Sequence, residues 1–211
     1  MRIARPAALA VIASGCLSKP GLDCELAAVG AGQIDAQIGT AGGVPSGATD
    51  CGPRAVVGVG FWLTRDPNMM FGEKTAVRAA LRCATLENHD GGYATGATED
   101  LAAIGGSEAK LDGPFFAECP GGRVVIGLAA QLLGATGLFN SIAIDCAALD
   151  PGGAPAGDAV RVPVVGTGTG PTEVEAACRE GRVLHGLESV SGRELDQVKL
   201  RCAQATCGPP P

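Results

Sequence analysis

The chain carries one segment three times, and each copy is bracketed by two cysteines. The copies run from Cys51 to Cys83, from Cys119 to Cys146 and from Cys178 to Cys202. Each opens with Cys, a turn, Arg and apolar residues, and each closes with alternating apolar and polar residues before the second Cys. Alternation with a period of two is typical of an antiparallel strand with one buried face. We therefore predict three β-hairpins in a fold built on an internal repeat of about 60 residues.

The cysteine positions predict a disulfide framework. The midpoint of each bracket falls in or beside a turn signal, such as Asp66-Pro67-Asn68 in the first copy and Ser191-Gly192 in the third. Cysteines placed symmetrically about a turn face one another across the two strands, within disulfide reach. Repeat symmetry therefore predicts three bridges, and the two cysteines left near the ends of the domain are expected to tie the termini together. The predicted pairs are Cys51–Cys83, Cys119–Cys146, Cys178–Cys202 and Cys24–Cys207.

The composition excludes several classes of function. The 33 glycines and 14 prolines are spread along the 211 residues, which favours many short strands over long helices. A net charge of −6 argues against a nucleic-acid partner, because such proteins carry a basic footprint. The chain has two histidines and no Cys-x-x-Cys pair, and its Gly-rich segments lack the Lys-Ser/Thr of a phosphate-binding loop. We expect no metal site and no cofactor.

The N-terminus resembles an export signal. Arg2 and Arg5 precede a short apolar run, residues 7–13, and small residues then lead to Cys16. The sequence Ala-Ser-Gly-Cys resembles a bacterial lipobox, whose cysteine is lipidated, although Ala13 stands where the motif usually has Leu or Val. The alternative is ordinary secretion. Either route places the protein outside the cytoplasm, where disulfides persist, with the lipid anchor on Cys16 expected in the bacterial envelope at the outer membrane.

Each hairpin is preceded by a Gly-rich segment and an approach strand. The Gly-rich segments are Ile38 to Gly43, Ile104 to Gly106 and Val165 to Gly170. From Cys24 to Cys207 this pattern resembles the β-prism family, which includes jacalin-type lectins and vitelline membrane outer layer proteins. The latter likeness is the closer one, because of the cysteines and of Gly60-Phe61-Trp62-Leu63. The resemblance implies an all-β prism of three four-stranded Greek-key repeats with pseudo-three-fold symmetry, and a β-trefoil is the alternative fold.

The predicted boundaries follow from these segments. We expect a signal peptide at 1–15, a tether at 16–23, one domain at 24–207 with repeats at about 24–85, 86–148 and 149–207, and a tail at 208–211.

The same resemblance implies a carbohydrate site. In jacalin-type lectins, sugar sits between a Gly-Gly loop and a Gly-x-x-x-Asp loop. Gly192 to Asp196 matches the second motif, and the Gly-rich segment of the same repeat supplies Gly166 and Gly168. Counting back from the closing Cys, the second repeat has Asn140 and the first has Val77 in place of Asp196. The alternative is that Asp196 only caps a hairpin turn.

Two apolar features have two readings each. Because neighbouring strand residues point to opposite faces, one of Phe61 and Trp62 faces outward, and an exposed Trp62 would be a platform for a sugar ring. The tip of the second hairpin, with Leu132-Leu133 and Leu138-Phe139, is either a partner surface or an inward-folded end-cap.

Catalysis is not expected. His89 lies in a polar loop and His185 in a strand, and no nucleophile–base spacing is present. A glycosidase would need carboxylates such as Glu73, Glu118 and Asp145 to pair in space. We therefore predict a non-enzymatic, lectin-like domain that binds a glycan or a cell-envelope polysaccharide. The alternative is a structural surface lipoprotein without a small ligand.

Overall fold

The computed structural model describes residues 23–27, 33–65, 74–89, 92–107, 109–133, 137–165 and 172–208, which form strands and turns and no helix. None of these residues therefore belongs to a helix that could cross a membrane. The predicted signal peptide and Cys16 lie outside them. The strands are β1 (Asp23–Ala27), β2 (Ile34–Gly39), β3 (Val44–Asp50), β4 (Ala55–Arg65), β5 (Lys74–His89), β6 (Gly92–Asp100), β7 (Ile104–Gly105), β8 (Asp112–Glu118), β9 (Val124–Leu132), β10 (Phe139–Leu149), β11 (Pro155–Val165), β12 (Thr172–Ala177), β13 (Val183–Ser191) and β14 (Leu195–Gly208).

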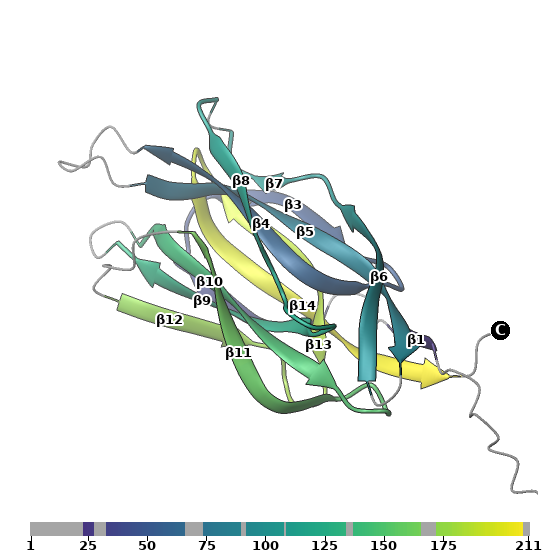
Figure 1. Cartoon of the computed structure of the whole chain (residues 1–211). Helices are drawn as coiled ribbons and strands as arrows, with labels where there is room; N and C mark the ends of the chain where they lie inside the picture. Colours follow the sequence, from purple (N-terminus) through teal and green to yellow (C-terminus); the bar gives the residue numbers. More distant parts are fainter. Residues whose placement is uncertain are drawn as a thin grey trace, which may run out of the picture.

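The second hairpin shows the plan of each sheet. β9 and β10 pair with each other, β11 then adds to the outer side of β10, and β12 crosses over to add to β9. Four consecutive strands therefore form a Greek key in the order β11-β10-β9-β12. Figure 1 shows this sheet as one wall of the molecule.

The other two hairpins follow the same plan. β4 and β5 are flanked by β8 on one side and by β6 and β7 on the other. β13 and β14 are flanked by β3 and β2, which come from the beginning of the domain and complete the last sheet. β1 pairs with both β14 and β5 and joins these two sheets. The prediction of three Greek-key sheets in a β-prism is confirmed, and the alternative of a β-trefoil is not.

Each sheet combines strands from neighbouring sequence repeats. The strand that leads into a hairpin pairs with the first strand of the hairpin before it, so β8 pairs with β4 and β12 pairs with β9. By the same rule β3, which leads into the first hairpin, pairs with β13 of the last. The three sheets are thus closed into a ring by the exchange of one strand each, and this decides which loops meet.

The arginine of each Cys-turn-Arg segment stabilises this arrangement by contacting a flanking strand. In every sheet it reaches the strand that flanks the second hairpin strand, at the beginning of the hairpin. Arg54 pairs with Glu99 of β6, Arg123 Nη1 donates to the Asp158 carbonyl of β11 (3.0 Å), and Arg182 Nη1 pairs with Asp35 of β2 (2.8 Å). In all three sheets this arginine contacts the equivalent flanking strand, which explains why the sequence repeats it. In the third sheet the contact holds β2 against the third hairpin.

Disulfides close the base of each hairpin. The structure contains Cys51–Cys83, Cys119–Cys146 and Cys178–Cys202, the pairs that repeat symmetry predicted, with Cα–Cα distances of 5.5, 5.6 and 5.7 Å. Three disulfides are typical of an extracellular or secreted domain. The register of β1 and β14 places Cys24 directly opposite Cys207, and their bridge stays a prediction.

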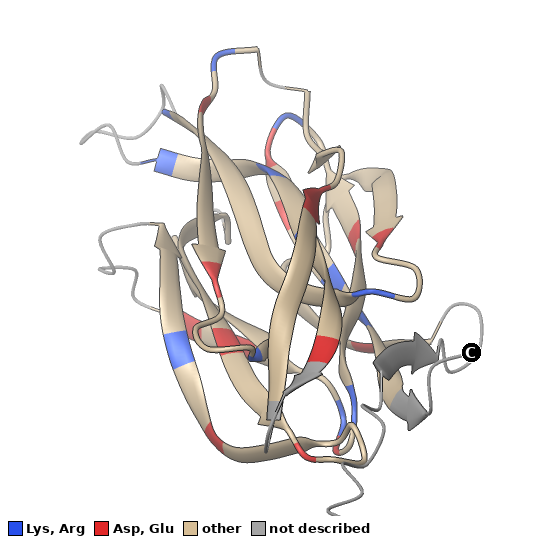
Figure 2. Cartoon of the chain, turned by 45° about the vertical axis from the view of Figure 1, so that its right-hand side comes forward, with Lys and Arg blue, Asp and Glu red and all other residues tan. Residues whose placement is uncertain are grey.

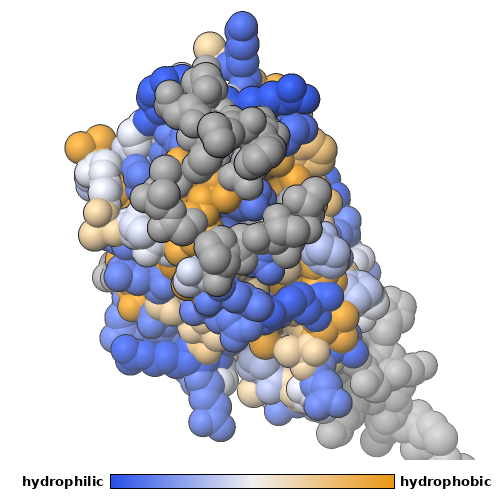
Figure 3. Space-filling model, turned by 90° about the vertical axis from the view of Figure 1, so that its left-hand side faces the viewer, coloured by the Kyte–Doolittle hydropathy of each residue, from blue (hydrophilic) through white to orange (hydrophobic). Residues whose placement is uncertain are grey.

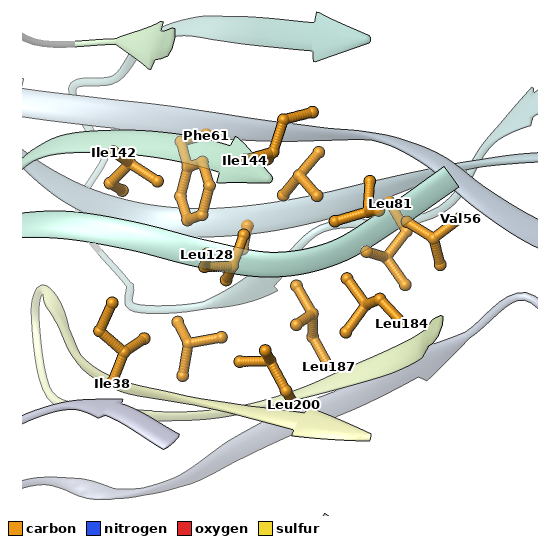
Figure 4. Close-up of a cluster of buried hydrophobic side chains, with 14 of the residues drawn as sticks. Ile38, Val56, Phe61, Leu81, Leu128, Ile142, Ile144, Leu184, Leu187 and Leu200 are labelled. Atoms are coloured by element: carbon orange, nitrogen blue, oxygen red, sulfur yellow. The ribbon is translucent and has the colours of Figure 1, made fainter. Parts of the chain in front are cut away.

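The core lies on the prism axis, where the three sheets meet. Figure 4 shows side chains from all three sheets pointing toward one another, with Phe61 of β4, Leu128 of β9 and Leu187 of β13 among them. Phe61 is buried and its neighbour Trp62 is half-buried on the outer face. The apolar residues at the second hairpin tip are also buried, as an end-cap of the core rather than a partner surface; they are Leu132, Leu133, Leu138 and Phe139.

Candidate functional site

The strand ends that lead into the three hairpin turns lie at one end of the prism, which is at the left of Figure 1 and faces the viewer in Figure 3. Hydrophilic residues dominate the rim of this end in Figure 3. The opposite end carries the Cys-turn-Arg segments and the disulfides. The β13–β14 turn therefore lies at the end away from the disulfides.

Asp196 is fixed at the tip of the third hairpin. Its carboxylate oxygen Oδ2 accepts a hydrogen bond from the Gly192 amide at 3.0 Å, across the turn between β13 and β14. Its carbonyl oxygen accepts a hydrogen bond from the Thr40 amide at 2.9 Å. Gly192 is exposed and Asp196 is half-buried. The carboxylate is thus held in one orientation while remaining in contact with solvent.

The loop of residues 39–43, between β2 and β3, runs against this carboxylate. Gly42 and Gly43 are both exposed, and a Cβ at Gly42 would lie 3.5 Å from Asp196 Oδ1. A Cβ at Gly43 would lie only 2.5 Å from Oδ2 and 2.6 Å from the Ser191 carbonyl carbon. Gly43 also has a φ of +63°, which side chains disfavour. Only glycine at position 43 lets the loop approach the hairpin so closely.

The glycine loop that the structure places beside Asp196 is formed by residues 39–43, and the predicted contribution of Gly166 and Gly168 stays a prediction. Gly166 and Gly168 lie outside the described residues. The residues that flank their segment, Val165 and Thr172, pair within the second sheet. The prediction assumed that a Gly-rich segment serves the hairpin that follows it. In the described part of the chain, β2 and β3 flank the third hairpin, and the first Gly-rich segment, residues 39–43, connects these two strands beside its tip.

The equivalent positions in the other two sheets present no carboxylate. The Val77 carbonyl accepts a hydrogen bond from the Gly106 amide at 2.7 Å, as the Asp196 carbonyl does from Thr40. Val77 is fully buried, however, and so is its counterpart Asn140, at 6% exposure. The first and third sheets share the backbone contact and differ in the side chain, and among the three equivalent positions an accessible acid occurs in the third sheet alone.

A groove of about 770 Å³ opens on the other side of the same turn. Its lining residues come from β4, from the segment before β8 and from the β13–β14 turn; they are Thr64, Arg65, Ala109, Lys110, Leu111, Asp112 and Arg193. Gly106 approaches the Arg193 backbone so closely that a Cβ would collide with it. The turn is thus packed between residues 39–43 and residues 104–106, with Asp196 on one side and the groove on the other.

The remaining candidate residues do not converge. His185 is buried, and its Nε2 lies 2.9 Å from the Gly52 carbonyl oxygen. Burial lowers the pKa of His185 below its ordinary value. Glu118 and Asp145 are bound by different arginines, Arg82 at 3.0 Å and Arg161 at 2.8 Å. Glu73 and the His89 side chain lie outside the described part, within which no cluster of three metal-ligating side chains occurs.

No family model and no curated protein matches the sequence. Solved structures do. The matching structures are jacalin-related β-prism lectins. Calystegia sepium agglutinin has 12% identity and a TM-score of 0.48, over 81% of this chain and 97% of that one. Calsepa lectin in complex with a biantennary N-glycan has 15% identity and a TM-score of 0.46, over 83% and 98%. A mannose-specific jacalin-related lectin from Morus nigra, in complex with mannose, has 14% identity and a TM-score of 0.41, over 82% and 97%.

Proposed function

We propose that this chain is a lectin-like domain that binds glycan without catalysis at the tip of the third hairpin. The observation that carries the proposal is the position of Asp196. Its carboxylate is the one acid among the three equivalent hairpin positions, and it is clamped between the Gly192 turn and the loop of residues 39–43. The residues assigned to the site are Gly42, Gly43, Gly192 and Asp196.

The chemistry suits a sugar. A carboxylate accepts hydrogen bonds from two neighbouring hydroxyl groups of one ring, and backbone N–H groups donate to the ring and hydroxyl oxygens. Gly42, Gly43 and Gly192 are exposed and carry no side chain, so a sugar ring can approach the backbone closely. Since the Gly192 amide already orients the carboxylate, little conformational freedom is lost on binding.

The same proposal includes an extracytoplasmic location. Residues 1–15 direct export, Cys16 carries a lipid anchor in a bacterial outer membrane, and residues 16–23 tether the prism to it. Metabolic labelling with a palmitate analogue tests the anchor. Label incorporated by the natural chain and lost in Cys16→Ser supports it, whereas release of unlabelled protein into the medium supports ordinary secretion.

The binding test is a panel of glycans and cell-wall polysaccharides presented to the oxidised protein. Asp196→Asn keeps an oxygen that accepts from Gly192 and removes the charge that the sugar hydroxyls need, so binding is expected to weaken at least about tenfold. Asp158→Asn makes the same change at an exposed position on β11 and is expected to bind as the natural protein does. Melting curves verify that both variants fold.

Two outcomes would count against the proposal. Binding that is unchanged in Asp196→Asn would move the site elsewhere, with half-buried Trp62 the next candidate. The absence of binding across the panel would favour the alternative of a structural surface protein, in which the disulfides and the contacts of the repeated arginines only make the domain rigid.

A further inference from the structure

The groove beside the β13–β14 turn is distinct from the Asp196 site and has a different charge. Three of its seven lining residues are cationic, namely Arg65, Lys110 and Arg193, and all three are exposed. They come from separate segments of the chain, so the fold rather than the local sequence brings them together. This local positive charge contrasts with the net charge of −6 of the whole chain. Figure 2 shows Lys and Arg residues at the strand ends and turns of this end.

The acidic residue of the groove does not cancel this charge. Asp112 forms an ion pair with Lys74 at 2.8 Å, and Lys74 is not itself a lining residue. The pKa of Asp112 lies below its ordinary value, first because of the Lys74 hydrogen bond and charge and further because of the Arg65 charge. The Asp112 carboxylate therefore lies beside two cations, and the seven lining residues carry three positive charges and one negative charge.

The groove and the Asp196 site share one structural element. Arg193 follows Gly192 directly and precedes Asp196 by three positions, so a single turn supplies both sites. The turn is held from both sides, by the Thr40 amide on the Asp196 carbonyl and by the close approach of Gly106 to the Arg193 backbone. A ligand longer than one sugar ring that is bound at Asp196 extends over this turn toward the cations.

We propose that the groove is a second subsite, which binds the carboxylate of an acidic sugar next to the sugar held by Asp196, so that the ligand class is an acidic glycan. This inference rests on the proposed function. Arginine is suited to the role, because its planar fork donates two parallel hydrogen bonds to a carboxylate. A groove of about 770 Å³ lies within the usual range for small-molecule sites and accommodates a hexose ring.

The experiment compares uronic-acid oligosaccharides with their carboxyl-reduced counterparts, in which a neutral CH2OH group replaces each carboxylate. The probes are oligogalacturonate, hyaluronan and alginate fragments, measured by calorimetry at low and high salt. The natural protein is expected to bind at least one acidic form about tenfold more tightly than its reduced form, with the preference shrinking at high salt. In the double variant Lys110→Gln, Arg193→Gln this preference is lost while binding of the reduced form persists.

A matched variant controls for net charge. Arg179→Gln removes a cation that is exposed at the disulfide end of the prism and is expected to keep the preference. Equal binding of acidic and reduced forms, both abolished by Asp196→Asn, would overturn the acidic subsite and leave the lectin proposal standing. A charge preference that depends on Lys110 and Arg193 but not on Asp196 would keep the anion groove and overturn the Asp196 site. Absence of binding to every probe would overturn both.

Discussion

Replacing Gly43 by alanine tests whether the glycine loop and the third hairpin are matched as closely as the structure indicates. The new Cβ would lie 2.5 Å from Asp196 Oδ2 and 2.6 Å from the Ser191 carbonyl carbon, both inside the 3.0 Å that real Cβ atoms keep. The Ser191 contact is with backbone, which cannot rotate away as a side chain would. Either the loop or the hairpin tip must therefore move, and the carboxylate with it.

The magnitude follows from two contributions. Alanine in the left-handed region costs about 1–2 kcal/mol, and relieving a steric overlap in packed structure costs about 1–3 kcal/mol. The stiffer unfolded chain returns about 0.4–1 kcal/mol. We expect the free energy of unfolding of Gly43→Ala to fall by about 1–5 kcal/mol, and glycan binding to weaken at least about tenfold because the carboxylate is displaced.

Gly42→Ala is the matched control for stability. Its Cβ would make an ordinary 3.5 Å contact with Asp196 Oδ1, and its φ lies outside the left-handed region. Urea unfolding with the disulfides intact measures both variants, and Gly42→Ala is expected to stay within about 1 kcal/mol of the natural protein. Equal stability of the two variants would refute the argument, because it would mean that residues 39–43 do not pack against the hairpin as described.

Three further predictions concern the framework. Peptide mapping without reduction is expected to recover Cys24 linked to Cys207, and a free thiol at either position would contradict the register of β1 and β14. Replacing Cys178 and Cys202 together by serine removes a bridge across 24 residues and is expected to lower the free energy of unfolding, measured in urea, by about 3 kcal/mol in the chain-entropy model; a loss below about 1 kcal/mol would count against a rigid hairpin base. In the folded protein, burial lowers the pKa of His185 from 6.5, so the histidine of the unfolded chain takes up a proton first as the pH falls. The contribution of His185 to stability is therefore present above pH 6.5 and is lost as the pH falls below this value. The free energy of unfolding of the natural protein, measured relative to that of His185→Gln, is therefore expected to be smaller at about pH 5.5 than at about pH 8. An equal difference at both pH values would contradict this prediction.

The internal repeat made much of the fold predictable from the sequence. Alternation and the cysteine brackets identified three hairpins because both are local properties of paired strands. Local patterns contain no information on which loop meets which tip. That Gly43 lies beside Asp196 follows from the exchange of strands between sheets, which is a property of the closed ring.

The groove, too, could not be predicted from local sequence patterns. Arg65, Lys110 and Arg193 are far apart in the sequence, and the acidic composition gave no sign of a positive surface. The repeated arginine after each opening cysteine was visible as a pattern, but its partners were not. Glu99, Asp35 and the Asp158 carbonyl belong to flanking strands with no common motif.

The most direct test of the glycan site is an amide chemical-shift map. ¹⁵N-labelled, oxidised protein is titrated with the saccharide that binds most tightly in the panel. We predict that the largest shifts occur at the Gly42, Gly43 and Gly192 amides, and that Asp196→Asn removes them without changing the rest of the spectrum. Largest shifts at the disulfide end of the prism, or around Trp62, would contradict it.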